Sequence, residues 1–330
     1  MADYYGSKHG EPEQVSHHQK PAKTSIRKIA NSKTPGYSKI SASQELSALM
    51  KIKGSYNPSL VNKFTGNLEI TENNVRIIIY NYPDLFTAMR GSTRQLFLAL
   101  NMKYTEGNKL DELVILPLRE YMLIRGLKDY KSARKQVEAD LKVLSSIQFE
   151  WKEFRNKNKD YINTRISGGS EGILNGLIIF RFNKDFLIIL QSCKIMPIPN
   201  EILMFNSKWN PYSISLLIKI SEHMNMNYGK SNATVISVAS LLSYCPDLPS
   251  YEEVIANGRQ VTKRIIDPFE RDMDSITSIS WEYCGKNGFK IKPPTRFKEF
   301  SKANVKFSFK DYPDRKPIPK KKKKSTRKKL

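Results

Sequence analysis

The stretch YKSARKQVEADLKVL at residues 130–144, followed by SSIQFEW at 145–151, contains the change of pattern that decides the fold. In its first part apolar residues recur at helical spacing, at Ala133, Val137, Leu141 and Leu144. This spacing predicts a helix from Tyr130 to Leu144. In its second part Ile147, Phe149 and Trp151 alternate with polar residues, which is typical of a strand. A helix therefore leads directly into a β-hairpin.

The residues before this stretch predict three further elements. Ser92 to Gln95 has the pattern of a capping box, which predicts a helix starting at Ser92. A short apolar strand follows at 113–116, and a second helix at 119–125 is closed by Gly126. After this stretch, the sequence predicts one strand at 161–166 and another at 173–182. Helix, strand, helix, helix and hairpin is the order of a winged helix, whose third helix enters the major groove.

The second half of the chain repeats this order with different residues. Asn210-Pro211 predicts the start of a helix that runs to residue 225, and 235–236 and 238–244 predict a short strand and a short helix. A capping box at 250–253 precedes a long third helix at 259–276, with a kink or restart at Asp267-Pro268. A strand at 279–283 then meets 290–291 through the hairpin signal Asn287-Gly288. The predicted fold class is α+β, with two tandem winged-helix domains.

The distribution of charge sets the expected domain boundaries. The 330 residues contain 55 Lys and Arg against 32 Asp and Glu, for a net charge of +23. Residues 1–66 carry +6 and residues 290–330 carry +14, which leaves +3 for the middle. We therefore expect a flexible basic N-terminal extension at 1–66, an N-terminal winged helix at 67–190, a C-terminal winged helix at 191–289 and a flexible polybasic tail at 290–330. Such a charge points to a polyanionic partner such as nucleic acid or an anionic membrane face. The lysine run at 316–330 binds phosphate without reading sequence, or serves only as a solubilising tail or a nuclear-import signal.

The non-apolar faces of the two third helices give the candidate DNA contacts. The first helix offers Lys128, Lys131, Ser132, Lys135 and Lys142, the second offers Arg259, Gln260, Lys263 and Arg264, and the hairpin after it offers Lys286 and Lys290. Cations near a helix N-terminus oppose the helix dipole, so an anionic ligand explains them better than helix stability does. Arg and Gln are suited to guanine and adenine edges, whereas lysines suit phosphates. The alternative is a solvated basic face.

Several motifs that catalysis requires are missing from the sequence. There is no G-x-x-x-x-G-K-[ST] phosphate loop and no His-hydrophobe-His pair, and no tyrosine has the Arg and His neighbours of a strand-transfer enzyme. The three cysteines are widely spaced, which excludes a disulfide framework and a C-x-x-C metal knuckle. No apolar run has the length of a membrane span. We therefore expect a non-catalytic, cytoplasmic protein with no cofactor, no metal and no membrane partner.

Five segments of the second half resemble the C-terminal winged helix of plasmid replication initiators of the theta-replicating, iteron-binding kind. They are MPIPNEIL at 196–203, NPYS at 210–213, SYEEV at 250–254, RIIDPFER at 264–271 and SWEY at 280–283. RQLFL at 94–98, together with 130–144, is similar to the N-terminal winged helix of these proteins. The resemblance covers roughly residues 90 to 284 and rests on order and spacing.

The resemblance implies a bacterial protein that binds direct repeats in double-stranded DNA at a plasmid origin, promotes local melting and recruits a host helicase or helicase loader. It also implies a homodimer as one assembly state. Carried over residue by residue, it assigns base reading to Arg259, Gln260, Lys263 and Arg264, and backbone or partner contacts to Lys131, Ser132 and Lys135. Two alternatives remain open, namely a transcriptional repressor with no role in replication and a DNA-nicking enzyme.

Overall fold

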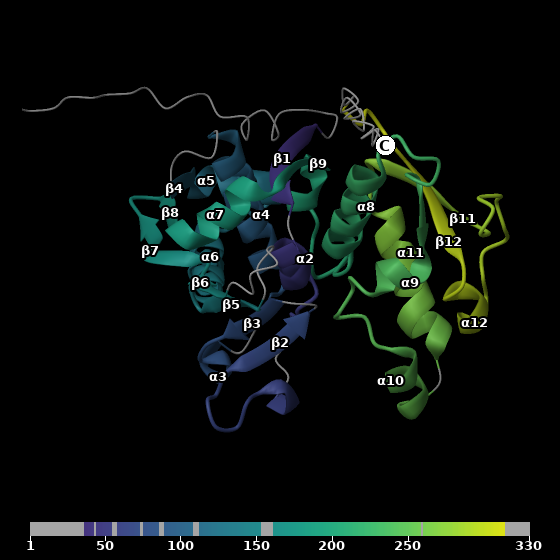
Figure 1. Ribbon diagram of the computed structural model, residues 1–330, viewed down its shortest axis with the longest axis horizontal. Helices are drawn as coiled ribbons and strands as arrows, with labels where there is room; N and C mark the ends of the chain where they lie inside the picture. The colour runs from purple at the N-terminus through teal and green to yellow at the C-terminus, as the bar shows by residue number, and fades with distance from the viewer. Residues whose placement is uncertain are drawn as a thin grey trace, which may run out of the picture.

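The computed structural model describes residues 36–42, 44–54, 58–72, 75–85, 89–107, 112–152, 161–258 and 260–313. The chain folds into two mixed α and β halves that lie side by side, joined by a two-stranded sheet (Figure 1). One continuous cluster of buried apolar residues extends through both halves. The α+β fold class is thus confirmed. None of the helices in the described part combines the length and the apolar character needed to cross a membrane.

The first half contains the predicted sequence of helices. It consists of α4 (Gly91–Glu106), β4 (Leu113–Pro117), α5 (Leu118–Arg125) and α6 (Tyr130–Ser145), followed by β7 (Ser167–Leu174) and β8 (Leu177–Phe182). Gly126 adopts the expected left-handed conformation after α5, with φ of 63°. The three strands form an antiparallel sheet in the order β4-β8-β7.

The prediction of a single strand over 173–182 is wrong, because a tight turn divides it. Asn175 and Gly176 have φ of 50° and 76°, and Leu174 pairs directly with Leu177. Two central residues with positive φ make a hairpin turn of the kind that Asn-Gly favours. The hairpin that belongs to the sheet of β4 is therefore β7-β8.

The strand predicted directly after α6 exists but has different partners from those expected. β5 (Ile147–Lys152) and β6 (Tyr161–Arg165) extend an N-terminal hairpin, β2 (Leu68–Glu72) and β3 (Val75–Ile79), to give the order β2-β3-β5-β6. The short helix α3 (Tyr82–Leu85) follows β3, and the 3-10 turn η1 (Pro58–Leu60) precedes β2. The half thus holds a second sheet that sequence alternation alone did not indicate.

The second half repeats the topology of the first. It consists of α8 (Ser213–Asn227), β10 (Val235–Ser237), α9 (Val238–Leu242), α10 (Tyr251–Ala256), the π-helical turn η3 (Thr262–Ile266), α11 (Asp267–Asp274), β11 (Ile279–Cys284), α12 (Phe297–Phe300) and β12 (Asn304–Phe309). Its sheet has the order β10-β12-β11, so in this sheet, as in β4-β8-β7, the first and last strands along the chain are neighbours. The capping box at Ser250 and Glu253 is confirmed, as is the restart of the third helix at Asp267.

Two segments predicted to belong to flexible tails are instead ordered parts of the fold. β1 (Tyr37–Ala42) pairs along its whole length with β9 (Lys194–Pro199), and α2 (Gln44–Met50) follows it. β12 is the central strand of its sheet and buries Val305 and Phe307. The predicted boundaries at 66 and 290 are wrong to this extent, because the basic composition of long windows concealed short apolar alternations. The remaining parts of both predicted tails, 1–35 and 314–330, lie outside the described residues.

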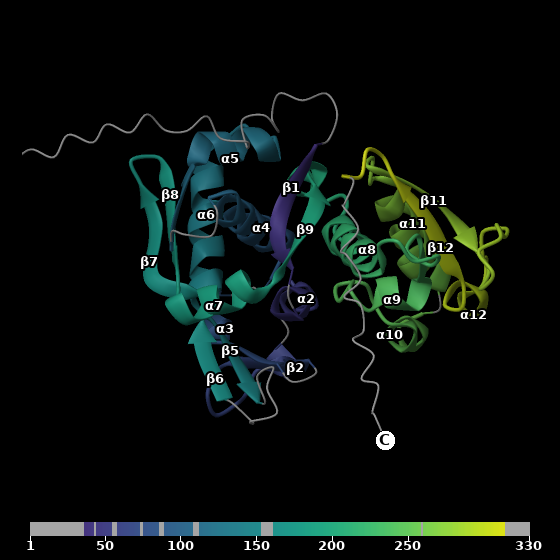
Figure 2. The same ribbon diagram turned by 45° about the horizontal axis from the view of Figure 1, so that its top comes forward.

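The connection between the halves is built around the N-terminus of α4. In Figure 2, β1 and β9 lie between α4 and α8; α4 contacts β1, and α8 contacts β9. α7 (Lys184–Ser192) precedes β9, and the 3-10 turn η2 (Asn200–Leu203) follows it. The Gln95 amide donates to the carbonyl oxygens of Ile202, Leu203 and Phe205, at 3.2, 3.2 and 2.8 Å. The capping box predicted at Ser92 and Gln95 does not form, since tertiary contacts use both side chains.

Arg94 forms a buried ion pair between the halves. Its side chain is 1% exposed, and its Nη2 donates to the carbonyl oxygen of Ile52 at 2.6 Å and to Oδ2 of Asp247 at 3.2 Å. The other oxygen of Asp247 accepts from the backbone N–H of Gly54 at 2.7 Å. Burial lowers the pKa of Arg94, while the Asp247 carboxylate opposes that shift.

Each half uses a buried aspartate of its third helix to bind the N-terminus of its first helix. Asp140 of α6 accepts from the hydroxyls of Ser92 and Thr93 at 3.0 and 2.7 Å. Asp272 of α11 accepts from the backbone N–H groups of Tyr212 and Ser213 at 2.6 and 3.1 Å. A negative charge is favourable at a helix N-terminus. Burial raises the pKa of both aspartates.

Replacing Asp247 by Ala should destabilise the protein strongly, because it leaves the buried Arg94 charge without its carboxylate. The expected loss is about 3–5 kcal/mol in the free energy of unfolding, measured by urea titration. Lys53→Ala is the control, since it breaks an exposed ion pair with Glu253 (3.4 Å) and should cost under about 1 kcal/mol. Equal losses for the two variants would contradict the role given to Arg94.

The raised pKa of Asp140 predicts a pH-dependent contribution to stability. Above the pKa of an unfolded aspartate, about 3.9, and below the raised folded value, the folded chain binds more protons than the unfolded chain. The contribution of Asp140 is therefore present in full at low pH and is lost as the pH rises through the folded pKa. We expect the free energy of unfolding of wild type, minus that of Asp140→Asn, to fall as the pH is raised from about 4 to neutrality. Parallel stability curves for the two proteins would show that burial does not control the ionisation of Asp140.

Candidate nucleic-acid interface

The exposed face of α6 carries a row of cations. Lys128, Lys131, Ser132 and Lys135 are all exposed, as predicted, and at about 100° per residue Lys131, Lys135 and Lys142 share one side of the helix. Glu138 lies on the same side, but its carboxylate accepts from Nε of Arg134 at 2.8 Å, which offsets its charge. Arg134, which the sequence pattern did not single out, is also exposed beside this row. Asp129 caps the helix by accepting from the Ser132 N–H at 2.7 Å.

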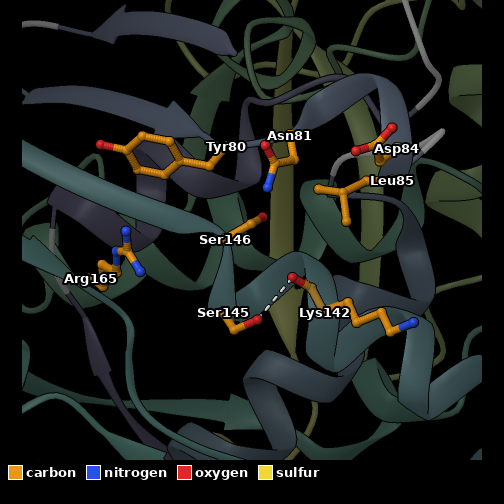
Figure 3. A pocket seen from close by; sticks show the side chains of 8 residues that line it. All are labelled: Tyr80, Asn81, Asp84, Leu85, Lys142, Ser145, Ser146 and Arg165. Atoms are coloured by element: carbon orange, nitrogen blue, oxygen red, sulfur yellow. Dashed lines mark hydrogen bonds between the residues drawn. The ribbon is translucent and has the colours of Figure 1, made fainter. Parts of the chain in front are cut away.

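Lys142 lies apart from the other cations of α6. Eleven residues at a rise of about 1.5 Å place it roughly 16 Å along the axis from Lys131. It lines a cavity of about 500 Å³ at the C-terminal end of the helix (Figure 3). The cavity also holds the Arg165 guanidinium, 5.2 Å from the ring of Tyr80, and Asp84 near the far rim. A cation in the last turn stabilises the helix through its dipole, so Lys142 has a structural role independent of DNA.

The third helix of the second half presents its cations at its beginning. Gln260, Lys263 and Arg264 are exposed, and Lys263 and Arg264 lie in the π-helical turn. Such turns occur frequently at functional sites. Arg259 lies outside the described residues.

Two of the acidic residues further along this helix are engaged with β11. The Tyr283 hydroxyl donates to Glu270 at 2.9 Å, and Nε1 of Trp281 donates to Asp274 at 2.9 Å. These carboxylates therefore satisfy aromatic donors within the half. The cationic end of the helix remains exposed to solvent for a ligand.

The segment that connects β11 to β12, residues 285–303, forms a basic projection. We call it the second wing, because it belongs to the second half. It contains six Lys and Arg against one Glu. The predicted contacts Lys286 and Lys290 are exposed at its start, where the Lys290 ammonium lies 3.2 Å from Glu282. Sequence reasoning counted the later cations with the tail and did not single them out; they are Lys292, Arg296, Lys298 and Lys302, all exposed. The local excess of charge was the available signal.

Aromatic packing holds the second wing against the third helix. Phe300 of α12 contacts Phe269 of α11 edge to face at 5.3 Å between ring centroids. Phe297 stacks on Tyr251 of α10 at 4.5 Å. α12 also contacts the π-helical turn that carries Lys263 and Arg264. The structure therefore brings together the cations of the helix and those of the wing.

In the described part of the chain, no three His, Cys, Asp or Glu side chains form a group that could hold a metal ion. The three cysteines are buried thiols.

No protein-family model and no curated protein sequence matches the chain. Among solved structures, a crystal structure of domains 2 and 3 of RctB is similar at 11% identity, with a TM-score of 0.43, over 80% of this chain and 98% of that one. A second structure of RctB domains 2–3 is similar at 12% identity, with a TM-score of 0.31, over 74% of this chain and 90% of that one. At such scores the likeness carries no conclusion about function.

Proposed function

We propose that the chain is a non-catalytic replication initiator in which two winged helices bind repeats in double-stranded DNA at a plasmid origin. The observation that carries the proposal is the repeated topology. Each half has a helix, a strand, two or more helices and two final strands, with the last strand between the other two. This is the connectivity that presents the third helix of a winged helix to the major groove.

The exposed side chains on these third helices support DNA as the ligand. Both helices expose cations that make no contribution to the apolar core. Phosphate contacts from such cations supply most of the affinity of a DNA-binding protein, and contacts to base edges supply its specificity. We assign base reading to Arg264 and Gln260, and phosphate binding to Lys131 and Lys135.

From the residues that resemble plasmid initiators we also propose local melting at the origin and recruitment of a host helicase or helicase loader. The same residues suggest a homodimer and a cytoplasmic location in a bacterium. The acidic and aromatic residues of 264–271 and 280–283, which contribute to that resemblance, pack together in the second half. Their contacts support a structural role for that part of the pattern and leave the cations of the same segment available to a ligand.

Replacing base-reading and phosphate-binding residues should have different effects on discrimination. Arg264→Ala or Gln260→Ala should cost about 1–3 kcal/mol on a duplex selected by the full-length chain and little on random DNA. Lys131→Ala and Lys135→Ala should weaken binding to both duplexes by similar factors, because phosphates are common to all sequences. The affinities of the four variants for both duplexes are measured at one salt concentration. Equal losses on both duplexes for Arg264→Ala and Gln260→Ala would remove base reading from the second half.

Melting and nicking assays separate an initiator from the alternatives. On supercoiled DNA that carries the selected site, the full-length chain should make thymines beside the site reactive to permanganate without cutting either strand, with or without Mg²⁺. A repressor would bind and leave the neighbouring duplex paired. Nicks that disappear on a single Tyr→Phe change would overturn the non-catalytic assignment.

A further inference from the structure

The tip of the second wing holds an aromatic side chain in solvent on a fixed backbone. Phe289 is 72% exposed. Its carbonyl oxygen accepts from the Gly285 N–H at 2.9 Å, and its own N–H donates to Oδ1 of Asn287 at 3.3 Å. Gly288 has φ of 78°, which closes the turn, and the Ile291 N–H donates to the Tyr283 carbonyl at 3.0 Å. The ring therefore projects from a hairpin whose backbone is hydrogen-bonded on both sides.

The surroundings of Phe289 are cationic. Lys286, Lys290 and Lys292 are exposed within three residues of it along the chain, and Ile291 is the nearest other exposed apolar residue. The hairpin of the first half also places an exposed apolar residue, Leu174, beside its Asn-Gly turn, but without lysines in that turn. An exposed aromatic ring with lysines close to it along the chain is complementary to a surface that offers both negative charge and an apolar interior. A DNA duplex is such a surface, with phosphates outside and stacked bases inside.

We propose that Phe289 is a wedge that inserts between two base pairs from the minor groove, while the lysines around it bind the flanking phosphates. This inference rests on the proposed function, because it requires a duplex held by the third helix. With that helix in the major groove, the wing beside it reaches the adjacent minor groove, whose width of about 6 Å suits a hairpin tip better than a helix. Apolar wedges inserted from the minor groove unstack a base step and kink the duplex.

The packing of the second wing holds Phe289 rigidly enough to insert between base pairs. An inserted ring must be held rigidly, because unstacking a base step costs a few kcal/mol. The hairpin backbone is hydrogen-bonded to β11, and α12 fixes the other end of the wing against α10 and α11 through Phe297 and Phe300. The wedge therefore acts where a third helix is already bound, and it supplies the first unstacked step for melting.

The test uses the full-length chain and a duplex that wild-type protein selects from random sequence, with 2-aminopurine placed in turn at each step beside the major-groove contacts. Wild type should raise 2-aminopurine fluorescence at one step and bend an end-labelled duplex, as measured by energy transfer. Phe289→Ala should abolish both signals and weaken binding by about 10-fold. It should leave the slope of log affinity against log salt unchanged, since no phosphate contact is lost. Lys286→Ala with Lys292→Ala should reduce that slope by up to about 0.9 per lysine.

Two control variants keep the interpretation unambiguous. Phe289→Leu preserves an apolar wedge and should retain part of both signals, whereas Ile188→Ala removes a side chain of similar exposure (58%) on α7 and should retain both fully. If wild type binds the duplex but Phe289→Ala unstacks and bends it equally, Phe289 does not insert between base pairs. Its exposed ring would then contact another ligand, such as a protein partner. If wild type selects no duplex at all, the proposed function itself fails.

Discussion

The relative placement of the two halves depends on one buried guanidinium, that of Arg94. Removing a charge from water is expensive, and a buried charge that loses its oppositely charged partner is strongly destabilising. The acceptors of Arg94 come from residue 52, before the first half's sheets, and from Asp247 in the second half. Any movement of one half against the other would separate these groups. The pairing of β1 with β9 also holds the halves together, because it fixes the strand that leads into α8.

Within each half, a buried aspartate fixes the helix that carries the cations. Asp140 and Asp272 belong to the third helices and bind the first turns of α4 and α8. In each third helix, the aspartate on the buried face therefore fixes the direction in which the exposed face points. Because α4 also carries Arg94, the orientation of α6 is linked to the junction between the halves. The exposed cations of the two halves are therefore held in one geometry relative to each other.

The sequence predicts the helices of this fold well and the strand partners poorly. Helical periodicity is local, so α5, α6 and the restart at Asp267 follow from a few neighbouring residues. Strand pairing is non-local, so nothing near β5 indicates that β3 is its neighbour, and nothing near β12 indicates that it occupies the centre of a sheet. The turn at Asn175-Gly176 had a local signal that was overlooked.

The candidate site shows the same division. The described cations predicted on the third helices are exposed, whereas the packing of α12 places the later cations of the second wing beside the third helix. We propose that two winged helices, held as one rigid unit, bind one face of a duplex. A hydroxyl-radical footprint of the full-length chain on its selected site tests this proposal. We expect two protected segments on the same face of the duplex, one helical turn or ~10 bp apart. Protection confined to a single half-turn would contradict it.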